Sequence, residues 1–172
     1  MPPPKIGGGW GWYNNGMFSV FEWKRSEIKF VIIVLVVLLG ISYAQLIIGQ
    51  MKTRDAQRRG DVNLVAKALD RYTKDHGSPP PAADGKIVSC GGKGIEVCEW
   101  GGGPVQDSEG VGYLNKIPMD PLAYKGWKYV YETDGTKFRV YVAWEYPRGL
   151  ETKPGLTAEC GGGVQCKWYA GN

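Results

Sequence analysis

Residues 30–49 read FVIIVLVVLLGISYAQLIIG, and 16 of these 20 residues are hydrophobic while none is charged. At a rise of 1.5 Å per residue, a helix of this length spans about 30 Å, which matches the hydrocarbon core of a bilayer. A cleaved secretory signal has a shorter apolar run, about 7 to 15 residues long, close to the N-terminus. The segment therefore predicts a retained transmembrane helix that crosses the membrane once.

Counting charges does not decide the orientation of this helix, because Lys and Arg residues flank both of its ends. The cysteines indicate the orientation instead. Cys90 and Cys98 form one close pair, and Cys160 and Cys166 form another, in a glycine-rich region with few apolar residues. Disulfides stabilise such regions and require an oxidising compartment, whereas structural zinc sites use shorter Cys spacings. We predict disulfides Cys90–Cys98 and Cys160–Cys166, although four cysteines allow three pairings. The C-terminal part is then expected outside the cytoplasm.

An amphipathic helix is expected directly after the span. Val62, Val65, Leu69 and Tyr72 recur at i, i+3, i+7 and i+10, which is one stripe of a helix. Arg58 and Asp61 have the i, i+3 spacing of a surface ion pair. Gly77 and the prolines after it end the pattern, and no proline separates it from the span. We therefore predict one continuous helix over residues 26–76, preceded by a flexible lead-in at residues 1–25.

Residues 77–172 are expected to form a small head rich in β-structure. Residues 82–112 are expected to be a long glycine-rich loop, while residues 127–132 and 137–144 show the alternation of two strands. Asp134-Gly135 between them suits a type I′ hairpin turn, in which both central residues have positive φ. The hairpin and the apolar stripe of the helix each need a partner for burial. The fold class predicted is α+β, a long helix packed on a small antiparallel sheet.

Two segments resemble a known family. Residues 54–79, RDAQRRGDVNLVAKALDRYTKDHGSP, and residues 113–131, YLNKIPMDPLAYKGWKYVY, are similar to segments of type IV pilins and of the G-type pseudopilins of type II secretion. The resemblance covers about residues 26–146. It implies a pilin-like fold and a structural role in a filament. It also implies that copies of the chain, other pilin-like subunits, and the secretion or pilus assembly machinery are partners.

The resemblance also assigns a role to Glu27. Family pilins carry a glutamate at this distance from the matching segment, where its carboxylate neutralises the N-terminal amine of a neighbouring subunit in the filament. The family's peptidase cuts after a glycine, and the matching position here is Glu22. A second candidate cut lies between Gly16 and Met17. Without a cut, Glu27 is an acid in the first helical turn that the helix dipole stabilises.

The sequence contains no recognisable catalytic motif. His76 is the only histidine, so a metal site with two histidines is excluded, and no G-x-S-x-G, P-loop or Rossmann fingerprint occurs. We expect no catalytic residues, no metal and no cofactor. After residue 50 there are 17 basic and 15 acidic residues, which is not the broad basic surface of a nucleic-acid-binding protein. Nucleic acid is therefore not an expected partner.

A cluster of basic residues lies directly after the span and comprises Lys52, Arg54, Arg58 and Arg59. The base expectation for it is a solvated helix face, and its favoured partners are anionic lipid headgroups or neighbouring subunits. The sequence thus predicts a structural subunit of a bacterial type IV pilus or secretion pseudopilus, held in the cell membrane or assembled into an extracellular filament. The alternative is an uncleaved, membrane-anchored binding module whose head uses its tryptophans to capture a partner. Burial of these tryptophans in the core is the simpler expectation.

Overall fold

The computed structural model describes residues 24–172, which form two compact units that divide between Ala44 and Gln45. Most of the lead-in expected at residues 1–25, and the candidate cut between Gly16 and Met17, therefore lie outside the described residues. The longest element is helix α1 (Arg25–His76), which contains 52 residues. It is the one long helix that the sequence predicts.

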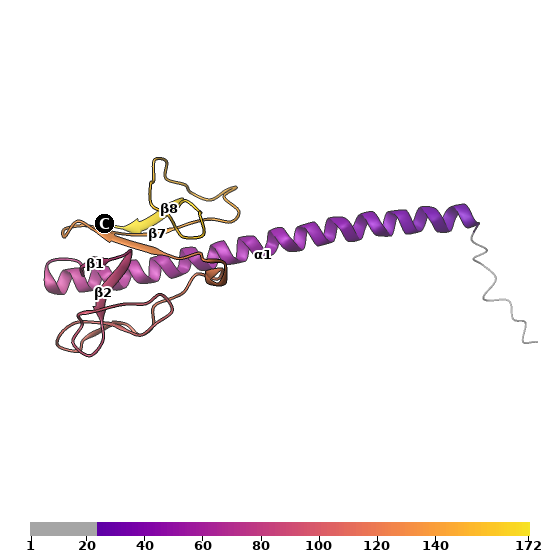
Figure 1. Ribbon diagram of the computed structural model, residues 1–172. Coiled ribbons are helices and arrows are strands. Elements are labelled where there is room, and N and C mark those ends of the chain that lie inside the picture. Colours follow the sequence, from indigo (N-terminus) through magenta and orange to yellow (C-terminus); the bar gives the residue numbers. More distant parts are fainter. Residues whose placement is uncertain (1–23) are drawn as a thin grey trace, which may run out of the picture. The chain divides into compact units, whose positions relative to one another are not determined.

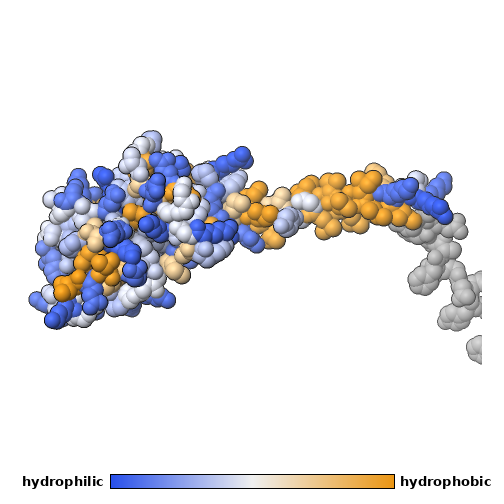
Figure 2. Space-filling view, in the orientation of Figure 1, coloured by the Kyte–Doolittle hydropathy of each residue, from blue (hydrophilic) through white to orange (hydrophobic). Residues whose placement is uncertain are grey.

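The first unit is the apolar part of α1, and its side chains are exposed on every face of the helix. Phe30 and Leu39 are each 68% exposed. Figure 2 shows the corresponding apolar surface, with a hydrophilic patch at the start of the helix. This segment is long and apolar enough to cross a membrane. Because side chains of this kind are favourable only when they leave water, lipid or other apolar helices must surround them.

The second unit, Gln45–Asn172, combines the rest of α1 with three small antiparallel sheets (Figure 1). The first sheet has the order β1-β2-β3, the second pairs β4 with β5, and the third has the order β6-β7-β8. The bounds of the strands, and of the short helix η1 that precedes β6, are β1 (Ala82–Ala83), β2 (Lys86–Cys90), β3 (Glu96–Val97), β4 (Val105–Gln106), β5 (Gly112–Leu114), η1 (Ala123–Lys125), β6 (Val130–Thr133), β7 (Phe138–Val142) and β8 (Trp168–Gly171). The fold class is α+β, as predicted.

The expectation of a long loop over residues 82–112 is wrong, because four short strands lie in it. Strand β2 places Ile87 and Ser89 in the interior, and they are 1% and 0% exposed. The hydroxyl of Ser89 donates a hydrogen bond to the carbonyl of Gln106 at 2.8 Å. A polar residue can therefore occupy an inward position of this strand. The sequence then lacks the alternation of apolar and polar residues by which a strand is predicted.

The predicted hairpin forms as β6 and β7, with Thr133 opposite Phe138, but its turn is not type I′. Gly135 has φ +89°, whereas the φ of Asp134 is not positive. The Asp134 carboxylate instead accepts hydrogen bonds from the backbone N–H groups of Thr136 and Lys137 at 2.8 and 2.7 Å. These bonds stabilise a longer loop that needs only one residue with positive φ.

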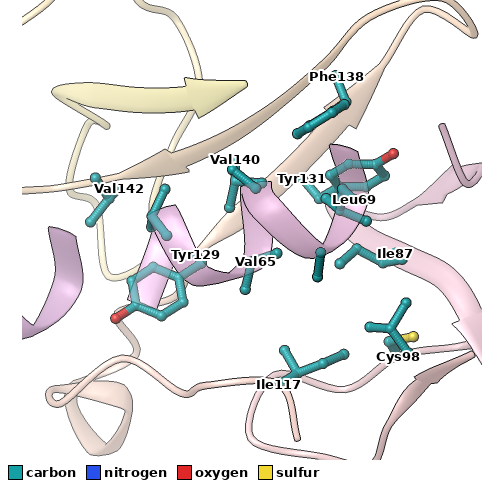
Figure 3. Close-up of a cluster of buried hydrophobic side chains, with 14 of the residues drawn as sticks. Val65, Leu69, Ile87, Cys98, Ile117, Tyr129, Tyr131, Phe138, Val140 and Val142 are labelled. Atoms are coloured by element: carbon teal, nitrogen blue, oxygen red, sulfur yellow. The ribbon is translucent and has the colours of Figure 1, made fainter. Parts of the chain in front are cut away.

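The core of the second unit is formed on both sides of α1. Figure 3 shows Val65 and Leu69 of the helix at the centre of this cluster. Val140 of β7 packs on one side, and Ile87 of β2 with Ile117 packs on the other (Figure 3). All five side chains are at most 1% exposed. The predicted apolar stripe is therefore buried, and the helix lies between the β6-β7-β8 sheet and the β2 region.

Candidate functional site

The second unit contains a buried ion-pair network that joins α1 to two distant segments. We use the term ion-pair network for five side chains, those of Arg54, Asp55, Arg58, Asp120 and Glu145. Arg58 is fully buried, and its guanidinium donates to Asp120 through Nε at 2.8 Å and Nη2 at 3.1 Å. Its Nη1 donates to Asp55 at 2.7 Å and to Glu145 at 2.9 Å. Arg54 holds Glu145 with two further hydrogen bonds, at 2.6 and 2.7 Å.

Two aspartates of the network also accept hydrogen bonds from backbone N–H groups. Asp55 accepts hydrogen bonds from the backbone N–H groups of Glu145 and Tyr146, at 3.0 and 2.8 Å. Asp120 accepts one from the backbone N–H of Leu122 at 2.7 Å. The network therefore fixes the loop before β6 and the segment after β7 against the same two turns of α1.

Electrostatics favour the charged forms of Arg58 and Glu145. Burial lowers the pKa of Arg58, but the hydrogen bonds that Arg58 donates to Asp120 and to the other carboxylates outweigh burial, so its pKa is raised. Burial likewise raises the pKa of Glu145, but the hydrogen bonds from Arg54 and Arg58 outweigh it and lower the pKa. Each charge therefore has a fixed partner. These pairings hold the side chains of the network in fixed positions.

The sequence did not predict this network, because Arg58 and Asp61 were expected to pair on the surface. That expectation is wrong: Arg58 is buried, and Asp61 accepts a hydrogen bond from the hydroxyl of Tyr129 at 2.8 Å. One signal was available in the sequence. Extending the stripe back from Val62 by four and seven residues reaches Arg58 and Asp55, which places both on the buried face.

A second polar cluster lies at the end of α1. The Nε2 atom of His76 lies 3.2 Å from Oδ2 of Asp107 and 3.2 Å from the hydroxyl of Tyr113. The ring of Tyr72 lies 4.3 Å from that of His76, between centroids. Burial raises the pKa of Asp107, but hydrogen bonds from the backbone of Val111 and its neighbours outweigh this and lower it. The predicted helix-terminal histidine is thus paired with an ionised carboxylate.

The predicted cysteine pairs form both disulfides. The Cα atoms of Cys90 and Cys98 are 5.2 Å apart, and those of Cys160 and Cys166 are 5.1 Å apart. Glu27 lies in the first turn of α1, where its exposed carboxylate accepts a hydrogen bond from the backbone N–H of Lys24 at 3.1 Å. This is one half of a capping box, and it matches the interpretation of Glu27 as an acid of the first helical turn.

The head tryptophans are mostly core residues. Trp144 and Trp168 are buried, at 6% and 8% exposure. Trp127 covers the Arg58 guanidinium, whose Cζ lies 4.6 Å from the ring centroid. Trp100 packs edge-on against Tyr129. The described residues therefore present no platform of these four tryptophans to solvent.

No family model, curated protein or solved structure matches the chain. Within residues 24–172, no group of three or more His, Cys, Asp or Glu side chains is arranged to hold a metal ion. The described polar clusters consist of paired charges that connect α1 to the head.

Proposed function

We propose that this protein is a structural, pilin-like subunit of a bacterial type IV pilus or of a pseudopilus-like filament of type II secretion, which assembles through its hydrophobic N-terminal helix. The observation that carries the proposal is the contrast along α1. Its apolar part has exposed side chains on every face, while Val62, Val65 and Leu69 further along are fully buried against the sheets. One helix therefore serves two environments.

The apolar part of α1 is suited to exchange between lipid and protein. A helix that is apolar on all faces is stable in a bilayer, and the same faces can pack against other apolar helices. Copies of this chain or other pilin-like subunits would replace lipid in a filament. The secretion or pilus assembly machinery would drive this exchange, and membrane lipids would surround the subunit before it.

The ion-pair network supports the proposal through the two segments that resemble the pilin family. Arg58 lies in the first segment and Asp120 in the second, and their bidentate ion pair joins the two. The disulfides Cys90–Cys98 and Cys160–Cys166 support a location of the head outside the cytoplasm, because they persist in oxidising compartments. The chain would then cross the bacterial cell membrane once.

A second candidate is a static membrane anchor that carries a binding module and is never cleaved. The observation that favours it is the hydrogen bond from the Lys24 N–H to the Glu27 carboxylate. Because this carboxylate has a donor in its own chain, it does not need the amine of a neighbouring subunit.

Coexpression with a pilus or type II secretion assembly machinery tests the first candidate. A cysteine introduced at Val36, in the apolar part of α1, should crosslink copies into ladders, and filaments should be visible by electron microscopy. Intact mass then separates the candidates. A chain that starts at Met17 or Trp23 with a methylated amine supports processing into a filament, whereas the full-length mass supports the anchor. A strictly monomeric protein without crosslinks would overturn the filament proposal.

A further inference from the structure

The second unit has an uneven distribution of charge. Residues 45–69 contain five basic and two acidic residues, whereas residues 70–112 contain four basic and seven acidic residues. Of the five basic residues in the first group, Arg54 and Arg58 are engaged by the ion-pair network. Lys52 and Arg59 are exposed and are not part of it. The expected basic cluster after the span is therefore divided between the interior and the surface.

The exposed cations belong to a surface that the fold assembles from three segments. We call it the basic aromatic surface; its members are the exposed Lys52, Arg59 and Arg148, the half-buried Tyr146 and Lys153, and the buried Trp168 beneath them. Two cations lie over the ring of Tyr146, with Lys52 Nζ 5.3 Å and Arg148 Cζ 6.0 Å from its centroid. The ring of Trp168 has the same arrangement, with Arg59 Cζ at 5.6 Å and Lys153 Nζ at 5.9 Å. In each case one cation comes from α1 and the other from the segment after β7.

These four cations are available to an anion. Among the described residues, the ion pairs within 4.0 Å involve Arg54, Arg58, His76 and Lys86 as cations, and none involves the four of this surface. Glu145, a nearby carboxylate, is already held by the network. The rings align the cations but do not neutralise them, since cation–π contacts leave the positive charge intact. An anionic partner would therefore remove an unfavourable concentration of like charge.

The surface lies next to the apolar end of the same unit. Leu46, Ile47 and Ile48 are exposed in its first helical turn, and Lys52 follows Ile48 by one turn of α1. At 1.5 Å per residue, Lys52 is about 6 Å along the axis from Ile48, and Arg59 is about 10 Å further. The headgroup region on each side of a bilayer is about 5 to 8 Å thick, and the Debye length is about 8 Å at physiological salt. Phosphate groups at that boundary are thus within reach of these cations.

We propose that the basic aromatic surface binds anionic phospholipid headgroups and holds the head against the membrane in the unassembled subunit. Lys52 and Arg148, which both lie over the ring of Tyr146, donate to lipid phosphate, and Tyr146 occupies the interfacial layer that aromatic residues prefer. Arg59 and Lys153 add long-range attraction to the charged surface. The inference rests on the proposed membrane anchorage and is independent of filament formation. A second copy is the less favoured partner, because the anchored chain places these cations at the lipid boundary without any association.

The test uses the full chain, one copy per nanodisc, in neutral phosphatidylcholine and in phosphatidylcholine with 30% phosphatidylglycerol. Hydrogen–deuterium exchange of residues 145–153 is measured in both. We expect exchange at least about fivefold slower in the anionic discs, which is the effect of a single cation near an anionic surface, and recovery of fast exchange in 0.5 M salt. The variant Lys52→Gln/Arg148→Gln/Lys153→Gln should show no difference between the two lipids.

A matched control replaces three exposed lysines elsewhere on the head, as Lys93→Gln/Lys116→Gln/Lys137→Gln, and should keep the full lipid effect. Equal exchange in neutral and anionic discs would overturn the proposal. Slower exchange that appears only in discs with two copies would also overturn it and would assign the surface to a second subunit. Incorporation into discs reports anchorage separately: a chain that never enters either disc contradicts the membrane anchor, whereas a chain that enters both without a lipid effect contradicts only the docking.

Discussion

Replacing Arg58 by methionine would remove the central cation of the ion-pair network while keeping the side chain long and apolar. Glu145 would retain both hydrogen bonds from Arg54, and Asp55 would retain two backbone N–H donors. Asp120, which is 3% exposed, would retain only the N–H of Leu122. Asp55 and Asp120 would therefore both lose their only charged partner, and Asp120 would be the less compensated of the two because it keeps a single donor.

The expected loss is about 3 to 5 kcal/mol in the free energy of unfolding, the range for breaking a buried ion pair by removing one partner. The lost contact between Arg58 and Trp127 contributes to the same total. Urea unfolding of the full chain in detergent micelles, followed by tryptophan fluorescence, measures the change. The variant Arg58→Met/Asp120→Asn should recover at least about 1 kcal/mol, because it removes the less compensated of the two carboxylate charges.

The neighbouring Arg59→Met is the matched control, since Arg59 is exposed and contacts only the face of Trp168 among the described interactions. Its expected cost is at most about 1 kcal/mol. If Arg58→Met and Arg59→Met lowered stability equally, or if the double variant were no more stable than Arg58→Met, the less compensated carboxylate would not be the cause and the reasoning would be refuted.

Three further outcomes follow from the second unit. Gly161→Ala should cost about 1 to 3 kcal/mol more than Gly163→Ala in the same urea assay, because both glycines have positive φ but only a Cβ at Gly161 would meet a backbone oxygen, at 2.1 Å. Replacing the Cys160–Cys166 disulfide by two alanines should cost about 2 kcal/mol, as the loop closed by a separation of 6 residues implies, and equal urea midpoints would contradict it. Stability should be highest between about pH 5 and pH 10. The lowered pKa of Glu145 contributes stability that is lost as pH falls below its ordinary value of 4.5, and the raised pKa of Tyr129, caused first by burial, contributes stability that is lost as pH rises above 10. A urea midpoint that rose on acidification would contradict this assignment.

The sequence predicted the features of this fold that depend on near neighbours. The exposed apolar part of α1 follows from residues 30–49, and the buried stripe follows from the spacing of Val62, Val65 and Leu69. The helix ends at His76 because Gly77 adopts φ +76° and its N–H bonds to the carbonyl of Thr73. Both disulfides join cysteines close in sequence. In each case the deciding interactions lie within a few residues of one another.

The features that the sequence did not predict depend on distant partners. Arg58 reaches Asp120 and Glu145 across 62 and 87 residues, so local spacing favoured Asp61 instead. Strand β8 consists of only four residues and is specified by pairing with β7 rather than by its own pattern, with Trp168 opposite Val142. A short strand buries too little by itself to show alternation, and its register is set by the strand beside it.

The charged residues of the ion-pair network limit how far the apolar part of α1 can extend along the helix. Well-packed hydrophobic residues in place of a buried ion network are often as stable or more stable, so tighter packing alone does not account for charges at this place. Apolar residues at positions 54, 55 and 58 would, however, leave Lys52, Arg59 and Asp61 as the only charges between residues 30–49 and Val62. A longer apolar run shifts or tilts in a bilayer, because lipid can accommodate any part of it. The buried charges hold the head to α1 without making this stretch lipid-soluble, and exposed Lys52 adds a cost to deeper insertion. In the proposed membrane anchorage, the residues that fasten the head would therefore also add to the charges that follow the span.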